Sequence, residues 1–295
     1  MKNQAFAFIK PHAMNSQATA THIEDVFEDE NIRVSFSERK TGNELKKIID
    51  RHFARISDFA FVKSISSLDL GLEGNELFLD AFGESWDDAA ASGRVLNSSD
   101  AMKKLGNISP KMLCTEWARY GAVEIVPDCY VSHFDEYDRY VLNGFYPIRR
   151  ESYTGDNAEV LVMLLDFEID WMDFNENIVG NDNPVSAHED SIRGYLYNHA
   201  AVLEMLIDSI DNIIHISSSP FEALCEKMIW LEKKLWLQDP LLTSASQLSG
   251  VKPDKIASWI FSHFKDPHMR NVLTGKNTDH VARILIDKFN KTSMS

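Results

Sequence analysis

The order of elements is clearest in the segment Asn212-Ile213-Ile214-His215-Ile216-Ser217-Ser218-Ser219-Pro220-Phe221-Glu222. Its first residues form a short apolar run, which predicts a strand. Ser219 then offers an N-cap hydroxyl, Pro220 fits the first helical position, and Glu222 completes a capping box. The segment therefore predicts a strand that runs directly into a helix over 219–237.

His215 lies at the junction between that strand and that helix. A lone histidine at a strand end is more often structural, but a helix N-terminus next to it favours a bound anion. Ser217 and Ser219 add hydroxyl groups, and Glu226 on the helix can reach back to orient the imidazole. A histidine that is oriented by an acid beside an anion site has the features of a nucleophile that forms phosphohistidine.

Four segments, in the same order along the chain, resemble the motifs of nucleoside diphosphate kinases. The segment around His215, with Glu226 and Trp230 after it, resembles the Asn-x-x-His-Gly-Ser-Asp-Ser motif of that family and its later acid and tryptophan. The resemblance covers roughly 4–56 and 130–237 and is nearest to longer, insertion-bearing relatives. The other three segments are Phe8-Ile9-Lys10-Pro11-His12-Ala13, Tyr137 with Phe145-Tyr146-Pro147, and Gly180-Asn181-Asp182-Asn183-Pro184 with Ser191-Ile192-Arg193-Gly194.

The resemblance implies a phosphotransferase that moves the terminal phosphate of an NTP to an NDP through a phosphohistidine on His215. Ser217 and Glu226 would hold the imidazole in the productive tautomer. Mg²⁺ would arrive with the nucleotide and bridge its phosphates with mostly water ligands, so we expect no dedicated metal site in the protein. The implied partners are nucleoside di- and triphosphates. Whether the protein forms a homo-oligomer stays open.

Five further residues receive roles from the resemblance, and most have an alternative. Lys10 would bind the ribose and the phosphates, or be an exposed lysine at a strand end. Arg193 would clamp the transferred phosphate, or form a surface ion pair. Tyr137 would lie beside the phosphoryl group, or pack on a helix. Phe145 would stack on the base, or belong to the core, and Asn212 would bind the sugar hydroxyl.

Several positions depart from the family motifs. His12 replaces the acid after Lys-Pro, and Ile216 replaces the glycine after the catalytic histidine. Asp182 replaces a phosphate-binding threonine in the predicted nucleotide site, and 173–177 contains no second arginine. These departures favour an alternative function, namely a catalytically inert kinase-like domain that binds a nucleotide or a protein partner.

We expect an α+β fold, a ferredoxin-like α/β sandwich in which helices pack on an antiparallel sheet. The kinase-like domain would cover 1–238, with a helical insertion at about 57–129, and a helical C-terminal extension would cover 239–295. The predicted strands are 5–9, 32–36, 159–167 and 212–215, and the main predicted helices are 21–30, 45–56, 99–105, 110–120, 192–210, 219–237, 253–264 and 278–290.

Composition limits the class of protein. The chain has 295 residues, 44% of them hydrophobic and 25% charged, which is typical of a folded globular protein. The longest apolar run, Val160–Leu165, is too short to span a bilayer. A formal net charge of −15 argues against nucleic-acid binding through the whole surface, although the residues from Pro240 onward are basic overall. Three cysteines without metal-ligand spacing suit a reduced cytoplasm.

Overall fold

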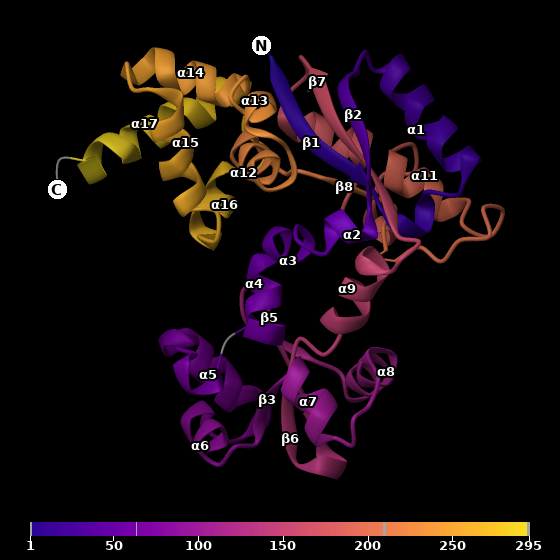
Figure 1. The fold of residues 1–295 in the computed structure, drawn as a ribbon, viewed down its shortest axis with the longest axis vertical. Coiled ribbons are helices and arrows are strands. Elements are labelled where there is room, and N and C mark those ends of the chain that lie inside the picture. The colour runs from indigo at the N-terminus through magenta and orange to yellow at the C-terminus, as the bar shows by residue number, and fades with distance from the viewer. Residues whose placement is uncertain (1, 63, 209–210, 294–295) are drawn as a thin grey trace. The chain divides into compact units, whose positions relative to one another are not determined.

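The computed structural model describes residues 2–62, 64–208 and 211–293. The chain divides into two compact units (Figure 1). Unit 1 comprises Met1–Leu45 and Asp156–Ser295, and unit 2 comprises Lys46–Gly155. Within the described ranges, no helix combines the length and the apolar character that a membrane span requires.

Unit 1 is built on a four-stranded antiparallel sheet. Its strands are β1 (Asn3–Ile9), β2 (Arg33–Thr41), β7 (Glu159–Phe167) and β8 (Ile214–Ile216). They lie in the order β2-β7-β1-β8, so that Ala7 of β1 is opposite Met163 on one side and Ile216 on the other. An antiparallel sheet in which the first strand lies between the third and the fourth is the ferredoxin-like arrangement, and the predicted fold class is confirmed.

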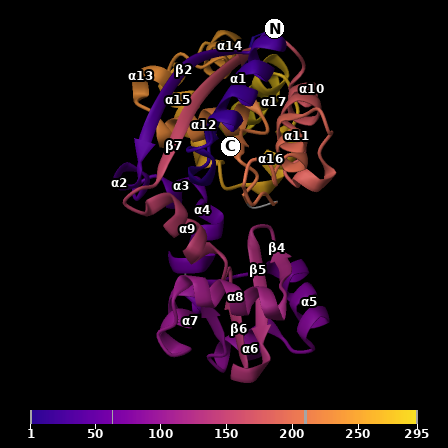
Figure 2. The ribbon, with the colours of Figure 1, turned by 90° about the vertical axis from the view of Figure 1, so that its right-hand side faces the viewer.

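The sheet of unit 1 separates two layers of helices (Figures 1 and 2). α1 (Gln17–Asp29) and α11 (Ile192–Asn198) cover one face. α12 (Pro220–Trp230) covers the other face, where the Trp230 ring stacks on the Phe8 ring of β1 at a centroid separation of 4.9 Å. Nearly every residue of α12 is buried, so this helix is at the centre of the unit.

The C-terminal helices belong to unit 1 and are joined to it by buried polar contacts. Lys227 of α12 and Asp239 form an ion pair with 2.6 Å between Nζ and Oδ2. The Oδ1 atom of Asn3 in β1 accepts hydrogen bonds from the N–H and the hydroxyl of Thr278. The other α-helices in the described part of the unit are α2 (Gly42–Leu45), α10 (Trp171–Asp173), α13 (Lys233–Trp236), α14 (Pro240–Ser249), α15 (Pro253–Ser262), α16 (Pro267–Leu273) and α17 (Thr278–Ser293).

Unit 2 has a second four-stranded sheet, with the order β3-β6-β5-β4. β3 pairs with β6 in parallel, and the other neighbours are antiparallel. Its strands are β3 (Val95–Asn97), β4 (Val123–Val126), β5 (Cys129–Phe134) and β6 (Arg139–Leu142). Its α-helices are α3 (Ile49–His52), α4 (Ala54–Ser57), α5 (Gly71–Phe82), α6 (Trp86–Ala91), α7 (Ser98–Lys104), α8 (Pro110–Tyr120) and α9 (Tyr146–Thr154).

Unit 2 differs from the helical insertion predicted at 57–129. It contains a sheet as well as helices, and it extends from Lys46 to Gly155 because β5 and β6 pair with β4 and β3 rather than with the sheet of unit 1. The strands of this sheet have three to six residues. Strands of that length give too few alternations of polar and apolar residues to be distinguished from turns.

The helix predicted over 192–210 is shorter than expected, because α11 ends at Asn198. Val202 and Leu206 follow at helical spacing, but both side chains are exposed and the spacing does not reflect a packed face. Residues 209 and 210, at the end of the predicted helix, lie outside the described residues.

Two other predicted helices are interrupted. The helix predicted over 45–56 is divided among α2, α3 and α4. The helix predicted over 219–237 is divided into α12 and α13, because Leu231 has an extended backbone. Its predicted start is confirmed, since Ser219 Oγ accepts the hydrogen bond of the Glu222 N–H at 3.2 Å.

Candidate functional site

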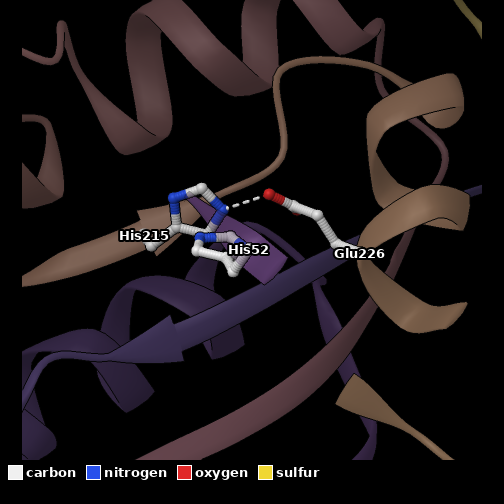
Figure 3. A group of neighbouring side chains, drawn as sticks. All are labelled: His52, His215 and Glu226. Atoms are coloured by element: carbon white, nitrogen blue, oxygen red, sulfur yellow. Dashed lines mark hydrogen bonds and ion pairs between the residues drawn. The ribbon is translucent and has the colours of Figure 1, made fainter. Parts of the chain in front are cut away.

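His215 lies in β8 and Glu226 faces it from α12 (Figure 3). His215 Nε2 and Glu226 Oε1 are 2.7 Å apart. The other oxygen of the same carboxylate accepts a hydrogen bond from Ser217 Oγ at 2.6 Å, and Ser217 Oγ in turn accepts one from the N–H of Phe6. Because strand, loop and helix follow one another directly, the short segment between His215 and Glu226 is enough to bring the three side chains together.

The contact with Glu226 determines which nitrogen of His215 carries the lone pair. An ionised carboxylate only accepts hydrogen bonds, so Nε2 carries the proton and Nδ1 has the lone pair. Burial lowers the pKa of the imidazole to about 3; Glu222 opposes this shift and Lys10 adds to it. The Phe8 ring stacks on the imidazole at 4.8 Å. His215 is therefore neutral near pH 7, which is the form that acts as a nucleophile.

The backbone just before β8 is strained. Ile213 has a φ of 72°, in the left-handed region that β-branched residues rarely adopt. Its carbonyl accepts the N–H of Lys10 at 2.8 Å, which fixes the start of β8 against the end of β1. The turn at Ile213 brings Asn212 beside the Lys10 side chain.

Lys10 and Asn212 form a buried polar chain that leads to the 180–182 loop. Lys10 Nζ donates to Asn212 Oδ1 at 2.6 Å, and Asn212 Nδ2 donates to the carbonyl of Asp182 at 2.8 Å. Lys10 is only 4% exposed, so its alternative interpretation as an exposed strand-end lysine is wrong. A buried ammonium group beside an amide side chain suits the recognition of hydroxyl and phosphate oxygens.

Arg193 is 5% exposed and links the same loop to β8. Its guanidinium donates to the carbonyls of Gly180 and Ile214 at 2.9 and 3.1 Å, and Nη1 lies 2.6 Å from Asp182 Oδ1. Gly180 has a φ of 88°, and a Cβ there would clash with the Ser191 hydroxyl, so glycine is needed at this turn. The Nε atom of Arg193 is also buried, and it has no hydrogen-bond partner among the described residues.

The contact between Arg193 and Asp182 has two consequences for the predicted phosphate clamp. Since the guanidinium is buried, the alternative of an exposed surface pair does not describe Arg193 itself. Asp182, however, is 87% exposed, and its carboxylate lies where a phosphate clamped by Nη1 would lie. An anionic ligand would have to displace this side chain from Arg193.

A cavity of about 590 Å³ adjoins this loop and is within the usual size range of ligand sites. Ile216 and Ser218 line it, while His215 is not one of its described lining residues and is 22% exposed on the α12 side of β8. The carboxylates of Asp182 and Glu176 also line the cavity. They are the hard oxygen donors that Mg²⁺ prefers, so the residues present fit a Mg²⁺ ion that arrives with a nucleotide.

Tyr137 and Phe145 belong to unit 2, whereas the other seven predicted site residues belong to unit 1. Tyr137 ends a 3₁₀ helix and is 47% exposed. Phe145 packs against Trp117 and Tyr130, with ring centroids at 5.2 and 5.9 Å. The predicted roles of Tyr137 and Phe145 beside a nucleotide stay predictions.

Two residues near His215 were not predicted as members of the site. Glu222 accepts hydrogen bonds from Ser218, and Arg270 pairs with Glu222. The spacing of Glu222 and Glu226, four residues apart on one helix face, could have indicated that both point toward the loop after β8. Arg270 is distant in sequence, and no pattern connects it with this loop.

No family model matches the chain, and the search of curated proteins finds no match either. Two solved structures to which the chain is similar are nucleoside diphosphate kinases. The enzyme from Aquifex aeolicus is 13% identical, with 79% of this chain and 98% of that chain covered and a TM-score of 0.35. The enzyme from Pyrobaculum aerophilum is 16% identical, with the same shares covered and a TM-score of 0.36. The strand order β2-β7-β1-β8 of unit 1 is by itself ferredoxin-like.

Proposed function

We propose that unit 1 is a phosphotransferase that moves the terminal phosphate of an NTP to an NDP through a phosphohistidine on His215. The observation that supports this most strongly is the 2.7 Å contact between His215 Nε2 and Glu226, which leaves the lone pair on Nδ1. Glu226 is itself buried and held by Ser217. A buried carboxylate in this position serves to orient an imidazole and to stabilise the charge that develops on it during reaction.

The reaction has two steps. In the first, the Nδ1 lone pair of His215 forms a bond to the γ-phosphorus, the bond from that phosphorus to the bridging oxygen breaks, and the NDP leaves with the electron pair. In the second, an oxygen of the acceptor's terminal phosphate forms a bond to the same phosphorus, and the N–P bond breaks and returns its pair to Nδ1. Glu226 keeps the proton on Nε2 in both steps.

Charge in the site assists transfer. Lys10 and Arg193 are buried cations, and such groups stabilise a phosphoryl group more strongly than exposed ones because water screens them less. Asn212 would exchange its contact with Lys10 for a hydroxyl of the nucleotide. Asp182 and Glu176, which line the cavity, would hold a Mg²⁺ ion bound with the nucleotide, and that ion would neutralise charge on the phosphates.

Incubation with γ-labelled ATP and Mg²⁺ tests the proposal. We expect an acid-labile, alkali-stable label on the wild-type protein, its loss in His215→Ala, and its discharge by added NDP. His280→Ala is the control, because it removes an exposed imidazole from α17 and should keep the label. An unlabelled wild type, or a label of equal strength in His215→Ala, contradicts the proposal.

A second candidate is a domain that binds nucleotide without transferring phosphate. The contact of Asp182 with Arg193 favours it, because an internal carboxylate occupies the cation that would otherwise meet a phosphate. The same experiment separates the two functions when nucleotide binding is measured in parallel by calorimetry. Binding without label supports this second candidate.

A further inference from the structure

Ser218, three positions after His215, is held at each of its polar groups. Its N–H and its hydroxyl donate to Glu222 Oε2 at 2.8 and 2.7 Å. Its carbonyl accepts from the Gly275 N–H and from Asn175 Nδ2, each at 3.0 Å. The loop between β8 and α12 is therefore fixed by groups from several parts of unit 1, and Gly275 comes from the C-terminal extension.

The extension also holds the other oxygen of Glu222. Arg270, in α16, places Nη2 at 3.0 Å from Glu222 Oε1. Burial opposes ionisation of the Glu222 carboxyl, but Arg270 and the hydrogen bonds from Ser218 outweigh burial, and the pKa lies below its ordinary value. Glu222 is thus a buried carboxylate whose charge is balanced by Arg270.

The charge of Glu222 acts on His215. Glu222 raises the pKa of the imidazole, against the lowering that burial and Lys10 cause. An anionic phosphate that approaches His215 meets the same negative charge, and repulsion between buried like charges is stronger than in water. Arg270 cancels this charge and, by holding Oε1, keeps Oε2 directed at Ser218.

We infer that Arg270 is a positioning residue for His215, which acts through Glu222 to fix the loop at Ser218 and to balance the buried charge of Glu222. The inference rests on the proposed function. It gives the C-terminal extension a part in the reaction, although Arg270 itself does not touch the substrate.

A double-mutant cycle with Arg270→Ala and Glu222→Gln tests the inference. Glu222→Gln keeps the shape of the side chain and removes its charge. In the wild-type background, Arg270→Ala should slow phosphohistidine formation from γ-labelled ATP by about 10- to 100-fold, as when a partner that orients a metal-binding histidine is removed. In the Glu222→Gln background the same change should slow it by less than about threefold, because the two residues act as one unit.

Three controls accompany the cycle. Arg270→Lys restores the positive charge and should recover most of the rate. Arg283→Ala removes an exposed arginine from α17, in the same extension, and should leave the rate unchanged. Thermal unfolding of each variant separates a loss of rate from a loss of fold. Arg270→Gln, which removes the charge and keeps most of the side chain, provides the measurement if Arg270→Ala does not fold.

The outcomes distinguish this inference from the function on which it rests. A labelled wild type whose rate is insensitive to Arg270→Ala overturns the inference alone. An equal loss in both backgrounds also overturns it, since Arg270 would then act independently of Glu222. A wild type that forms no phosphohistidine overturns both.

Discussion

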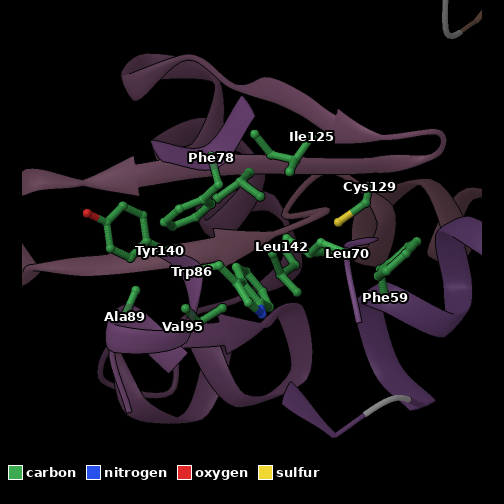
Figure 4. Close-up of a cluster of buried hydrophobic side chains, with 11 residues drawn as sticks. Phe59, Leu70, Phe78, Trp86, Ala89, Val95, Ile125, Cys129, Tyr140 and Leu142 are labelled. Atoms are coloured by element: carbon green, nitrogen blue, oxygen red, sulfur yellow. The ribbon is translucent and has the colours of Figure 1, made fainter. Parts of the chain in front are cut away.

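In both units helices pack against a sheet, but the two units bury different kinds of residue. In unit 2 a cluster of buried hydrophobic side chains surrounds Phe78, whose ring lies edge-on to Trp86 and Tyr140 at 5.3 and 5.1 Å (Figure 4). No Asp, Glu, Lys or Arg among the described residues of that unit is buried. Unit 1 contrasts with it, because its buried residues include Lys10, Lys40, Asp166, Arg193, Glu222, Glu226, Lys227 and Asp239.

Buried charge is costly unless it is paired, so its distribution indicates what a region is for. In unit 1 one buried pair, Lys227 with Asp239, connects α12 to the start of α14. Other buried charges gather around the strand of His215, where Glu226 contacts the imidazole and Arg193 contacts the Ile214 carbonyl. Unit 1 therefore contains two kinds of buried charge: the Lys227–Asp239 pair, which joins two helices, and the charges around His215, which are available for chemistry.

The largest effect on stability is expected at the buried ion pair of Lys227 and Asp239. Lys227→Met leaves Asp239 buried without its cation and should lower the free energy of unfolding by about 3–5 kcal/mol. Urea unfolding measures this. Lys227→Met combined with Asp239→Leu removes both charges and should recover most of the loss.

Unit 2 supplies the contrast for that prediction. Arg119 pairs with Glu116 and Glu136 at the surface, and Arg119→Ala should leave the free energy of unfolding almost unchanged. If Lys227→Met were as mild as Arg119→Ala, the view that unit 1 depends on buried charge would be wrong.

The elements of unit 1 were predictable from sequence where a local signal and burial agree. The apolar run of β7 is central in the sheet, and Ser219 caps α12 as its position before Pro220 predicts. The contact of His215 with Glu226 was predictable for the same reason, because strand, loop and helix are adjacent in the chain.

The remainder depends on contacts between residues that are distant in sequence. The pairing of β3 with β6 makes a strand of three residues stable, although Val95–Asn97 alone carries no strand pattern. Arg270 reaches Glu222 only because α16 packs beside α12, and sequence spacing contains no record of that packing. Exposed Leu206 shows the converse, an apolar residue at helical spacing that is not packed.

The contrast between the units also predicts that two glutamates, each of which accepts two hydrogen bonds, differ in their effect on the rate of phosphohistidine formation. Glu226 accepts from His215 and Ser217 in unit 1, while Glu84 accepts from Arg94 and Tyr140 in unit 2. Glu226→Gln should slow phosphohistidine formation by about 100-fold or more, since replacing the orienting acid of a serine-protease triad by its amide costs about 10⁴. Quench-flow measurement with γ-labelled ATP gives the rate.

Glu84→Gln is the matched change, and it should lower the thermal stability without altering that rate. Equal losses of rate in Glu84→Gln and Glu226→Gln would mean that the residues on which the reaction depends are not confined to unit 1.

The smallest effect is a pH dependence of stability that His215 adds to unit 1. The imidazole has a pKa of about 3 in the folded protein and an ordinary value of about 6.5 in the unfolded chain. Between these values the unfolded chain binds a proton that the folded protein does not, so stability falls as the pH decreases below about 6.5. His215→Asn removes this group, and the loss of stability from pH 7.5 to pH 5.5 should become shallower than in the wild type.

His280→Asn, which removes an exposed imidazole from the same unit, controls for the loss of a histidine. An unchanged slope in His215→Asn would mean that the imidazole is as easily protonated in the folded protein as in water, and the neutral nucleophile on which the contrast between the units depends would be lost.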